Sequence, residues 1–317
     1  MLPKTIKNLA PVITELATSI WSVYWTLVRI IIPVLILVKI LDSFGFTEVL
    51  ASAFSPLMSL VGLPDILGLV LATAVLTNMY TAMAIFLSLT SGMPPLSVAD
   101  ISVLSSMMLL AHSIPVEGVI ARAIGISWWI IICLRVGGAF LLGLMLHIMY
   151  ETTGSKQMDS IILWQPGSVD TGLVSWGLTQ LQTLAGLLVV LTLLMILLKL
   201  LKYFGVEKWI HWILAPLLKF LGIGKQASNV VVIGIMLGLS FGGGLLIQEA
   251  KNGSIPKRDI FLSMYFLCIC HSLIDDTIVV LLLGADIVGV LWIRIVFALV
   301  LIAIIARIPL VCRRLGY

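Results

Sequence analysis

The chain has 317 residues, of which 61% are hydrophobic and only 11% are charged, and its mean hydropathy is +1.18. A soluble domain has about a quarter of its residues charged, so this composition excludes a soluble globular protein and indicates a polytopic membrane protein. The formal net charge of +4 comes from 19 basic and 15 acidic residues without a basic tract, which gives no reason to expect nucleic-acid binding.

Apolar runs along the chain predict an all-α membrane protein with about ten hydrophobic segments. Residues 1–19 are predicted to be an amphipathic lead-in, 151–178 an external connecting loop and 313–317 a cytoplasmic tail. The expected segments lie near 20–40, 48–62, 66–90, 101–121 and 127–149, and then near 179–201, 206–221, 227–248, 259–283 and 287–309. The segments at 48–62 and 206–221 are short for a bilayer core of about 30 Å, so they are expected to be tilted, re-entrant or interfacial.

The two sets of segments form an internal duplication, with one unit over 20–150 and the other over 179–312. Shifting the chain by 160 residues, and by 159 after a one-residue slip, brings rare polar, proline and glycine residues into register. The matched pairs are Lys39 and Lys199, Pro56 and Pro216, Gly62 and Gly222, Asp100 and Asp259, His112 and His271, Ser113 and Ser272, Glu117 and Asp276, Gly125 and Gly284, and Arg135 and Arg294.

Charge bias predicts that the two repeats are inverted with respect to the membrane. The loop "TSGMPPLS" has no basic residue, whereas its counterpart "KNGSIPKR" has three, so the positive-inside rule places these equivalent loops on opposite faces. Five crossings per repeat then put both termini in the cytoplasm of a bacterial-type inner membrane, with Lys39 and Lys225 as exceptions. Four crossings per repeat would make the repeats parallel, which fits the charges less well.

The fourth segment of each repeat contains a histidine at mid-membrane depth. His112 and His271 each follow an aspartate by twelve residues, which is about 18 Å along a helix. Pro115 lies just beyond His112 and would free the carbonyl of Ala111. Such a break is tolerated in a membrane only where water, ligand or side chains satisfy the backbone.

Polar side chains accompany both histidines. Ser113 and Glu117 are four residues apart and share a helix face, and Ser272 and Asp276 repeat this spacing. The pattern is compatible with a locally capped kink, but its occurrence in both repeats favours a binding site at the repeat interface.

Arginines lie well inside both fifth segments. An arginine without a partner at this depth would cost several kcal/mol, so we expect ion pairs within each repeat. The predicted pairs are Arg135 with Glu117 and Arg294 with Asp276. They would serve either as fixed locks between two helices or as gating or anion-binding groups.

The third segments provide further candidate lining. Asn78 and Tyr80 in "TNMYT" would present a hydrogen-bonding face to a polar solute. In the second repeat, Gly243 is the middle of three successive glycines, which permit either close helix packing or an unwound stretch that offers carbonyls to a ligand.

The cysteines do not form a disulfide framework, because Cys133, Cys268, Cys270 and Cys312 all lie in or beside apolar segments. Cys268 is three residues from His271, so a soft-metal site with Asp275 is an alternative, although buried cysteine usually behaves as a small hydrophobe. No phosphate loop, nucleophile elbow or hydrolase carboxylate pair is present, so we expect neither an enzyme nor a cofactor.

The stretches "LLAHSIPVEGVIARAIG", "CICHSLIDDTIVVLLLGA" and "LAPLLKFLGI" resemble the gate, or nucleoside-recognition, domain family. The resemblance covers roughly 20–150 and 180–310 as two gate units. Members with similar units include spore-maturation membrane proteins and the membrane part of bacterial ferrous-iron permeases, and concentrative nucleoside transporters are more distantly similar. The resemblance implies a transport-like membrane domain and leaves the substrate open.

These observations predict an alternating-access transporter of a small polar solute, with nucleoside-like metabolites as the first expectation. Its partners would be the lipid bilayer, the solute and, as further options, a coupling ion and a second copy of the chain, but no nucleic acid. A divalent-cation permease and a structural or signalling membrane subunit are the alternatives. The predicted solute-binding residues are Asn78, Tyr80, His112, Ser113, Glu117, Gly243, His271, Ser272, Asp275 and Asp276.

Overall fold

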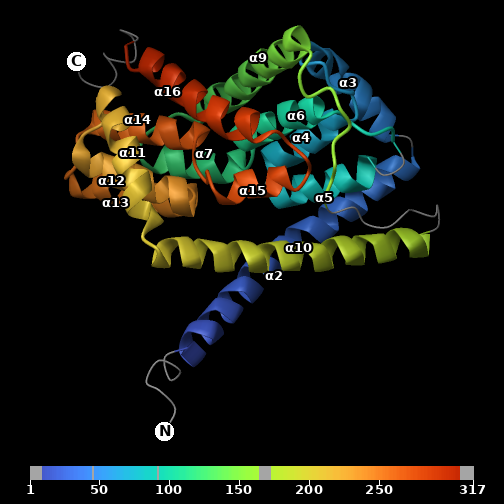
Figure 1. Cartoon of the computed structure of the whole chain (residues 1–317), viewed down its shortest axis with the longest axis horizontal. Helices are drawn as coiled ribbons and strands as arrows, with labels where there is room; N and C mark the ends of the chain where they lie inside the picture. Colours follow the sequence, from blue (N-terminus) through green and yellow to red (C-terminus); the bar gives the residue numbers. More distant parts are fainter. Residues whose placement is uncertain (1–8, 45, 91–92, 164–172, 308–317) are drawn as a thin grey trace.

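The structure, a computed structural model, describes residues 9–44, 46–90, 93–163 and 173–307, and it is all-helical as the sequence predicts (Figure 1). Within these described ranges, five helical stretches are long and apolar enough to cross a membrane. They are Thr14–Leu41, Val98–Ala123, Trp128–Thr153, Leu173–Leu201 and Val288–Ile305. Fewer stretches than the ten predicted segments meet this length, because several of those segments are short or interrupted.

The described parts of the two predicted repeats contain corresponding elements in the same order, except that the short helix α8 before η1 has no counterpart before η2. The first has α2 (Leu9–Ser43), α3 (Phe46–Leu60), α4 (Leu67–Leu76), α5 (Met79–Thr90), α6 (Val98–Ala111), α7 (Ile114–Ala123), α8 (Trp128–Ile132), the π-helix η1 (Cys133–Gly137) and α9 (Gly138–Thr153). The second has α10 (Leu173–Tyr203), α11 (Val206–Phe220), α12 (Lys225–Leu237), α13 (Leu239–Asn252), α14 (Lys257–Ile269), α15 (Asp275–Leu281), the π-helix η2 (Val288–Ile293) and α16 (Arg294–Ile305).

The predicted lead-in, connecting loop and tail lie partly outside the described residues. Residues 9–19 of the predicted lead-in belong to α2, and residues 1–8 lie outside the described residues. The same is true of residues 164–172 in the connecting loop and of the tail at 313–317, together with Cys312.

The two long helices α2 and α10 cross each other at equivalent positions (Figure 1). The Tyr24 hydroxyl donates to the Leu184 carbonyl at 3.2 Å, and these residues are 160 positions apart, which is the sequence register of the duplication. Contact between equivalent positions is what an internal two-fold relation produces. The crossing of α2 and α10 therefore joins positions that the predicted duplication makes equivalent.

Four segments that look continuous in sequence are each divided into two helices. The break between α4 and α5 falls at Thr77 and Asn78, where the Asn78 Oδ1 accepts from the Thr81 N–H at 2.9 Å and caps the second helix. The break between α12 and α13 falls at Gly238, whose φ of +84° suits glycine. The remaining breaks, after α6 and after α14, contain His112 and His271.

Pro115 behaves as expected for a residue next to a break. It lies in the first turn of α7, where its missing N–H removes no helical hydrogen bond. The triple glycine, in contrast, is inside α13 and does not unwind the helix. A Cβ at Gly243 would overlap the Ile120 side chain of α7, so this glycine permits close packing between the two halves.

The acidic residues at the start of the fourth segments hold helix ends. Asp100 and Ser97 form a reciprocal capping box, in which the Ser97 N–H donates to the Asp100 carboxylate at 3.1 Å. Asp259 accepts from the Gly224 N–H at 2.9 Å and so connects α14 to the start of α12. Both aspartates therefore fix the outer ends of the helices that carry the histidines.

We expect Gly243→Ala to be less stable than the matched variant Gly244→Ala by about 1–3 kcal/mol. Both substitutions gain the helix propensity of alanine, but only the Cβ at position 243 overlaps a neighbour, whereas Gly244 has nothing within 4 Å. Thermal melting of the two purified variants in the same detergent measures the difference. Equal stability would show that α13 and α7 do not pack closely at Gly243.

Candidate functional site

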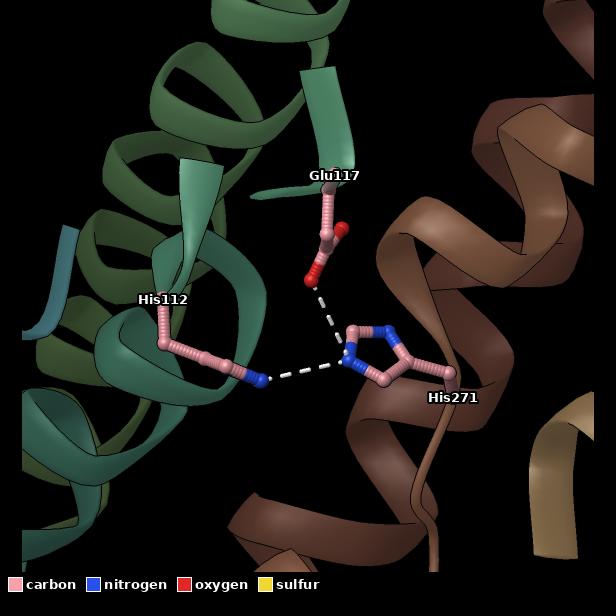
Figure 2. A group of neighbouring side chains, drawn as sticks. All are labelled: His112, Glu117 and His271. Atoms are coloured by element: carbon pink, nitrogen blue, oxygen red, sulfur yellow. Dashed lines mark hydrogen bonds and ion pairs between the residues drawn. The ribbon is translucent and has the colours of Figure 1, made fainter. Parts of the chain in front are cut away.

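The two histidines meet at the centre of the molecule. The Nε2 atoms of His112 and His271 are 3.2 Å apart, and the residues are only 6% and 3% exposed. Figure 2 shows the His112 and Glu117 side chains of the first half reaching toward the His271 ring of the second half. His112 and His271 are equivalent positions in the predicted duplication, so the centre lies where the two halves meet.

Each histidine ring is oriented by a backbone carbonyl of its own helix. The Nδ1 of His112 lies 3.1 Å from the Met108 carbonyl, and the Nδ1 of His271 lies 2.8 Å from the Leu267 carbonyl. A carbonyl can only accept, so both Nδ1 atoms carry the hydrogen. Both Nε2 atoms are thereby turned toward the centre.

A carboxylate from the opposite half faces each histidine. The Glu117 Oε1 lies 3.3 Å from the His271 Nε2, and the Asp276 Oδ2 lies 3.5 Å from the His112 Nε2. Glu117 and Asp276 are equivalent residues, so each half contributes one histidine and one acid to a reciprocal pair of contacts. The site is incomplete in either half alone.

The two arginines hold the ends of the broken helices. Arg135 donates from Nη2 to the His112 carbonyl at 2.7 Å, and Arg294 donates in the same way to the His271 carbonyl at 2.7 Å. Arg294 also donates from Nε to the Ile269 carbonyl at 3.3 Å. These bonds satisfy carbonyls that would otherwise be left at the C-terminal ends of α6 and α14.

The ion pairs of the two arginines differ. The Arg135 guanidinium and the Glu117 carboxylate form an ion pair, and both groups are buried. Arg294 is near enough to Asp276 for electrostatic attraction, but among the described ion pairs none joins these two residues. The predicted second pair is therefore replaced by the bonds of Arg294 to backbone carbonyls.

The predicted serines connect neighbouring breaks. Ser113 and Ser272 both have left-handed backbones, with φ of 55° and 48°. The Ser113 hydroxyl donates to the Thr77 carbonyl at 2.8 Å, and its N–H donates to the Ala74 carbonyl at 2.9 Å. In the second half the Leu273 N–H donates to the Ile235 carbonyl at 3.1 Å. The break after α4 thus abuts the break after α6, and α12 abuts the break after α14.

The other predicted residues have separate positions. Asn78 caps α5, and Gly243 packs against α7. Tyr80 is half-buried and lies close enough to Asp275 and Asp276 to interact with both, which places it beside the centre from the opposite half. Sequence reasoning missed the acceptor carbonyls of Ala74 and Thr77, because a backbone acceptor leaves no signal in residue type.

The proposed cysteine site does not assemble. Among the described residues, the metal-ligating atoms that converge belong to His112, Glu117 and His271, without Cys268. A separate groove of about 890 Å³ between α8, η1, α14 and α16 is mainly apolar, and its lining includes Phe261 and Tyr265. The described lining of this groove contains none of the predicted solute-binding residues.

Comparison with known proteins identifies the second half. Residues 184–286 match the family model described as gate, nucleoside recognition. This part of the chain is similar to a gate domain. The matched range contains His271, Ser272, Asp275 and Asp276, and the first half supplies the equivalents of His271, Ser272 and Asp276 from outside that range.

A relative of similar length exists in Bacillus subtilis (strain 168). The chain is 29% identical over 291 residues to the uncharacterized membrane protein YvoD, which covers 89% of this chain and 90% of that protein. The similarity therefore includes both the gate domain and the first half. No solved structure matches.

We expect Arg135→Met to lower the free energy of unfolding by about 3–5 kcal/mol, because it leaves the buried Glu117 carboxylate without its cation. Adding Glu117→Gln removes that charge and is expected to restore part of the loss. The exposed Arg122→Gln is a control that should change stability by less than about 0.5 kcal/mol. Thermal melting in detergent measures all four proteins, and a double variant no more stable than Arg135→Met would contradict the ion-pair explanation.

Proposed function

We propose that this protein is an integral membrane transporter of a small polar solute, with nucleoside-like metabolites as the first candidates. A gate domain within a membrane protein indicates a transport-related role. The observation that carries the finer proposal is the meeting of helix breaks and buried polar side chains from both halves. Discontinuous helices that meet at a repeat interface form the binding sites of many secondary transporters.

The buried polar groups around the histidines support binding of a polar solute. Oxygen atoms of Asp275, Asp276 and Thr277 are buried without a hydrogen-bond partner among the described residues. A buried polar atom without a partner costs free energy, which a bound solute with donor groups would recover. Tyr80 adds a hydroxyl to this side of the centre.

Loop contacts support inverted repeats. The Val98 N–H at the start of α6 donates to the Met158 carbonyl of the connecting loop at 2.9 Å. In the same loop, the Leu163 N–H donates to the Leu282 carbonyl after α15 at 3.0 Å. The same loop thus contacts the beginning of the fourth segment of the first repeat and the end of the fourth segment of the second repeat. This is the arrangement expected if equivalent segments run in opposite directions.

In the proposed mechanism one half moves against the other, and the centre becomes accessible from each face in turn. His112 and His271 would bond the solute directly, because both Nε2 atoms point into the space between the halves. Glu117 and Asp276 would carry charge that Arg135 and Arg294 balance. The contacts that change are those between α7 and α13 and between α5 and α15.

A disulfide across the two halves is expected to stop transport. A Cβ at Gly243 would lie 3.7 Å from the Ile120 Cβ, which is within the range of disulfide bonds. Proteoliposomes with Ile120→Cys and Gly243→Cys together should take up labelled uridine or adenosine when reduced, and at least tenfold more slowly when oxidised. Each single-cysteine variant controls for oxidation of the native thiols. Unchanged uptake after complete cross-linking would contradict the proposed movement, and no uptake across a broad solute screen would contradict transport.

Inverted repeats predict that equivalent loops are labelled from opposite faces. Met93→Cys, before α6, should react with a membrane-impermeant maleimide added outside intact cells, whereas Ser254→Cys, before α14, should react only after the cells are opened. The opposite charge bias of the two loops is the reason. Labelling of both residues from the same face would instead indicate parallel repeats.

A further inference from the structure

The centre brings together atoms that can only accept hydrogen bonds. Both histidine Nδ1 atoms donate to carbonyls, so in neutral histidines both Nε2 atoms present lone pairs to each other at 3.2 Å. The Glu117 Oε1 and the Asp276 Oδ2 face the same two nitrogens. Three of these acceptors, from His112, Glu117 and His271, lie within 4.8 Å of one another and repel one another unless a cation lies between them.

The spacing of three of these atoms, from His112, His271 and Glu117, fits three positions around a tetrahedral metal ion. Metal bonds to histidine nitrogen and carboxylate oxygen of about 2.0–2.2 Å place neighbouring ligand atoms of a tetrahedron about 3.3–3.6 Å apart. The observed separations are 3.2 Å between the two Nε2 atoms, 3.3 Å from the His271 Nε2 to Glu117, and 3.5 Å from the His112 Nε2 to Asp276. The ligand atoms of His112, Glu117 and His271 all lie within 4.8 Å of one another.

The surroundings of these side chains also resemble those of metal ligands. Metal-binding histidines usually donate their second nitrogen to a carbonyl or carboxylate, which fixes the ring orientation, and both histidines do so here. Arg135 contacts Glu117 in the same supporting role. The Asp276 Oδ2 is buried and has no hydrogen-bond partner among the described residues, so one acceptor remains for an ion.

The charge of the centre favours a cation. Glu117, Asp275 and Asp276 contribute three negative charges, and Arg135 and Arg294 contribute two positive charges, so with neutral histidines the centre has a net charge of −1. An imidazole pair with carboxylates suits zinc, iron or manganese, whereas magnesium and calcium prefer oxygen ligands alone.

We propose that His112, His271 and Glu117 bind one divalent first-row transition-metal ion that bridges the two halves. The first half provides His112 and Glu117 and the second half provides His271, so the bound ion is a cross-link between them, and Asp276 faces the His112 Nε2 beside this group. The proposal goes beyond solute transport and does not depend on it, because binding is measured without a solute or a membrane gradient. Cys268 has no part in this site.

The test uses the full-length protein, stripped of metal, incubated with ZnCl2 and passed through a desalting column. Metal analysis by mass spectrometry should find one zinc per chain, and zinc should raise the melting temperature. The double variant His112→Gln and His271→Gln should lose both effects, and Glu117→Gln should bind zinc at least about tenfold more weakly. Cys268→Ser is equally buried in α14 and should bind zinc like the wild type.

Two results would overturn the proposal. One is wild-type protein without stoichiometric zinc, manganese or iron, which would leave a shared proton as the species that separates the acceptors. The other is full metal retention by the double histidine variant. A melting transition for each variant in metal-free buffer shows that the protein is folded, and Glu117→Gln provides a near-isosteric change if the histidine variants are not. Because uptake assays are separate, loss of zinc binding and loss of transport are distinguishable.

Discussion

Inside a bilayer, every backbone N–H and C=O must find its partner within the protein, and this requirement governs the centre of this molecule. Helices are broken at four places, and each break exposes carbonyls and amides that have no partner in their own helix. The protein satisfies them with its own polar groups. Arg135 and Arg294 donate to the carbonyls of His112 and His271, and Ser113 donates to the carbonyls of the neighbouring break.

This constraint explains why two arginines are fully buried in such an apolar chain. A guanidinium has five donors in a fixed geometry, so one arginine can bind a carboxylate and a carbonyl together. Arg135 uses both kinds of contact, whereas Arg294 bonds to two carbonyls. In both halves an arginine donates to a backbone carbonyl at the helix break, but only the first half adds an arginine–carboxylate ion pair. Asp276 is left available to interact across the interface, where its nearest described ionic contact is His112.

The fold class and the membership of the centre could be predicted from sequence, because matched rare residues identify equivalent positions in a duplication. His112, His271, Glu117 and Asp276 were all identified in this way. The partners across the interface could not be predicted, since sequence register shows which residues are equivalent but not which of them touch. The prediction paired Asp276 with an arginine of its own repeat, whereas its close contact is with the histidine of the other repeat. The triple glycine was likewise ambiguous, because glycine permits both unwinding and close packing, and the break fell instead at Gly238.

The reciprocal geometry has a consequence for how the centre can function. Each histidine is oriented by its own helix but completed by an acid from the other half, so separation of the halves would remove both histidine–carboxylate contacts together. The Arg135–Glu117 ion pair lies within the first half and would persist. Opening would therefore expose two histidines with free Nε2 atoms while the helix ends remain capped by arginine. A species that binds both histidines, whether a solute, a proton or a metal ion, would favour the closed arrangement by its greater affinity for it. The polar residues of the broken helices thus divide into a permanent set that satisfies the backbone and an exchangeable set that responds to what is bound.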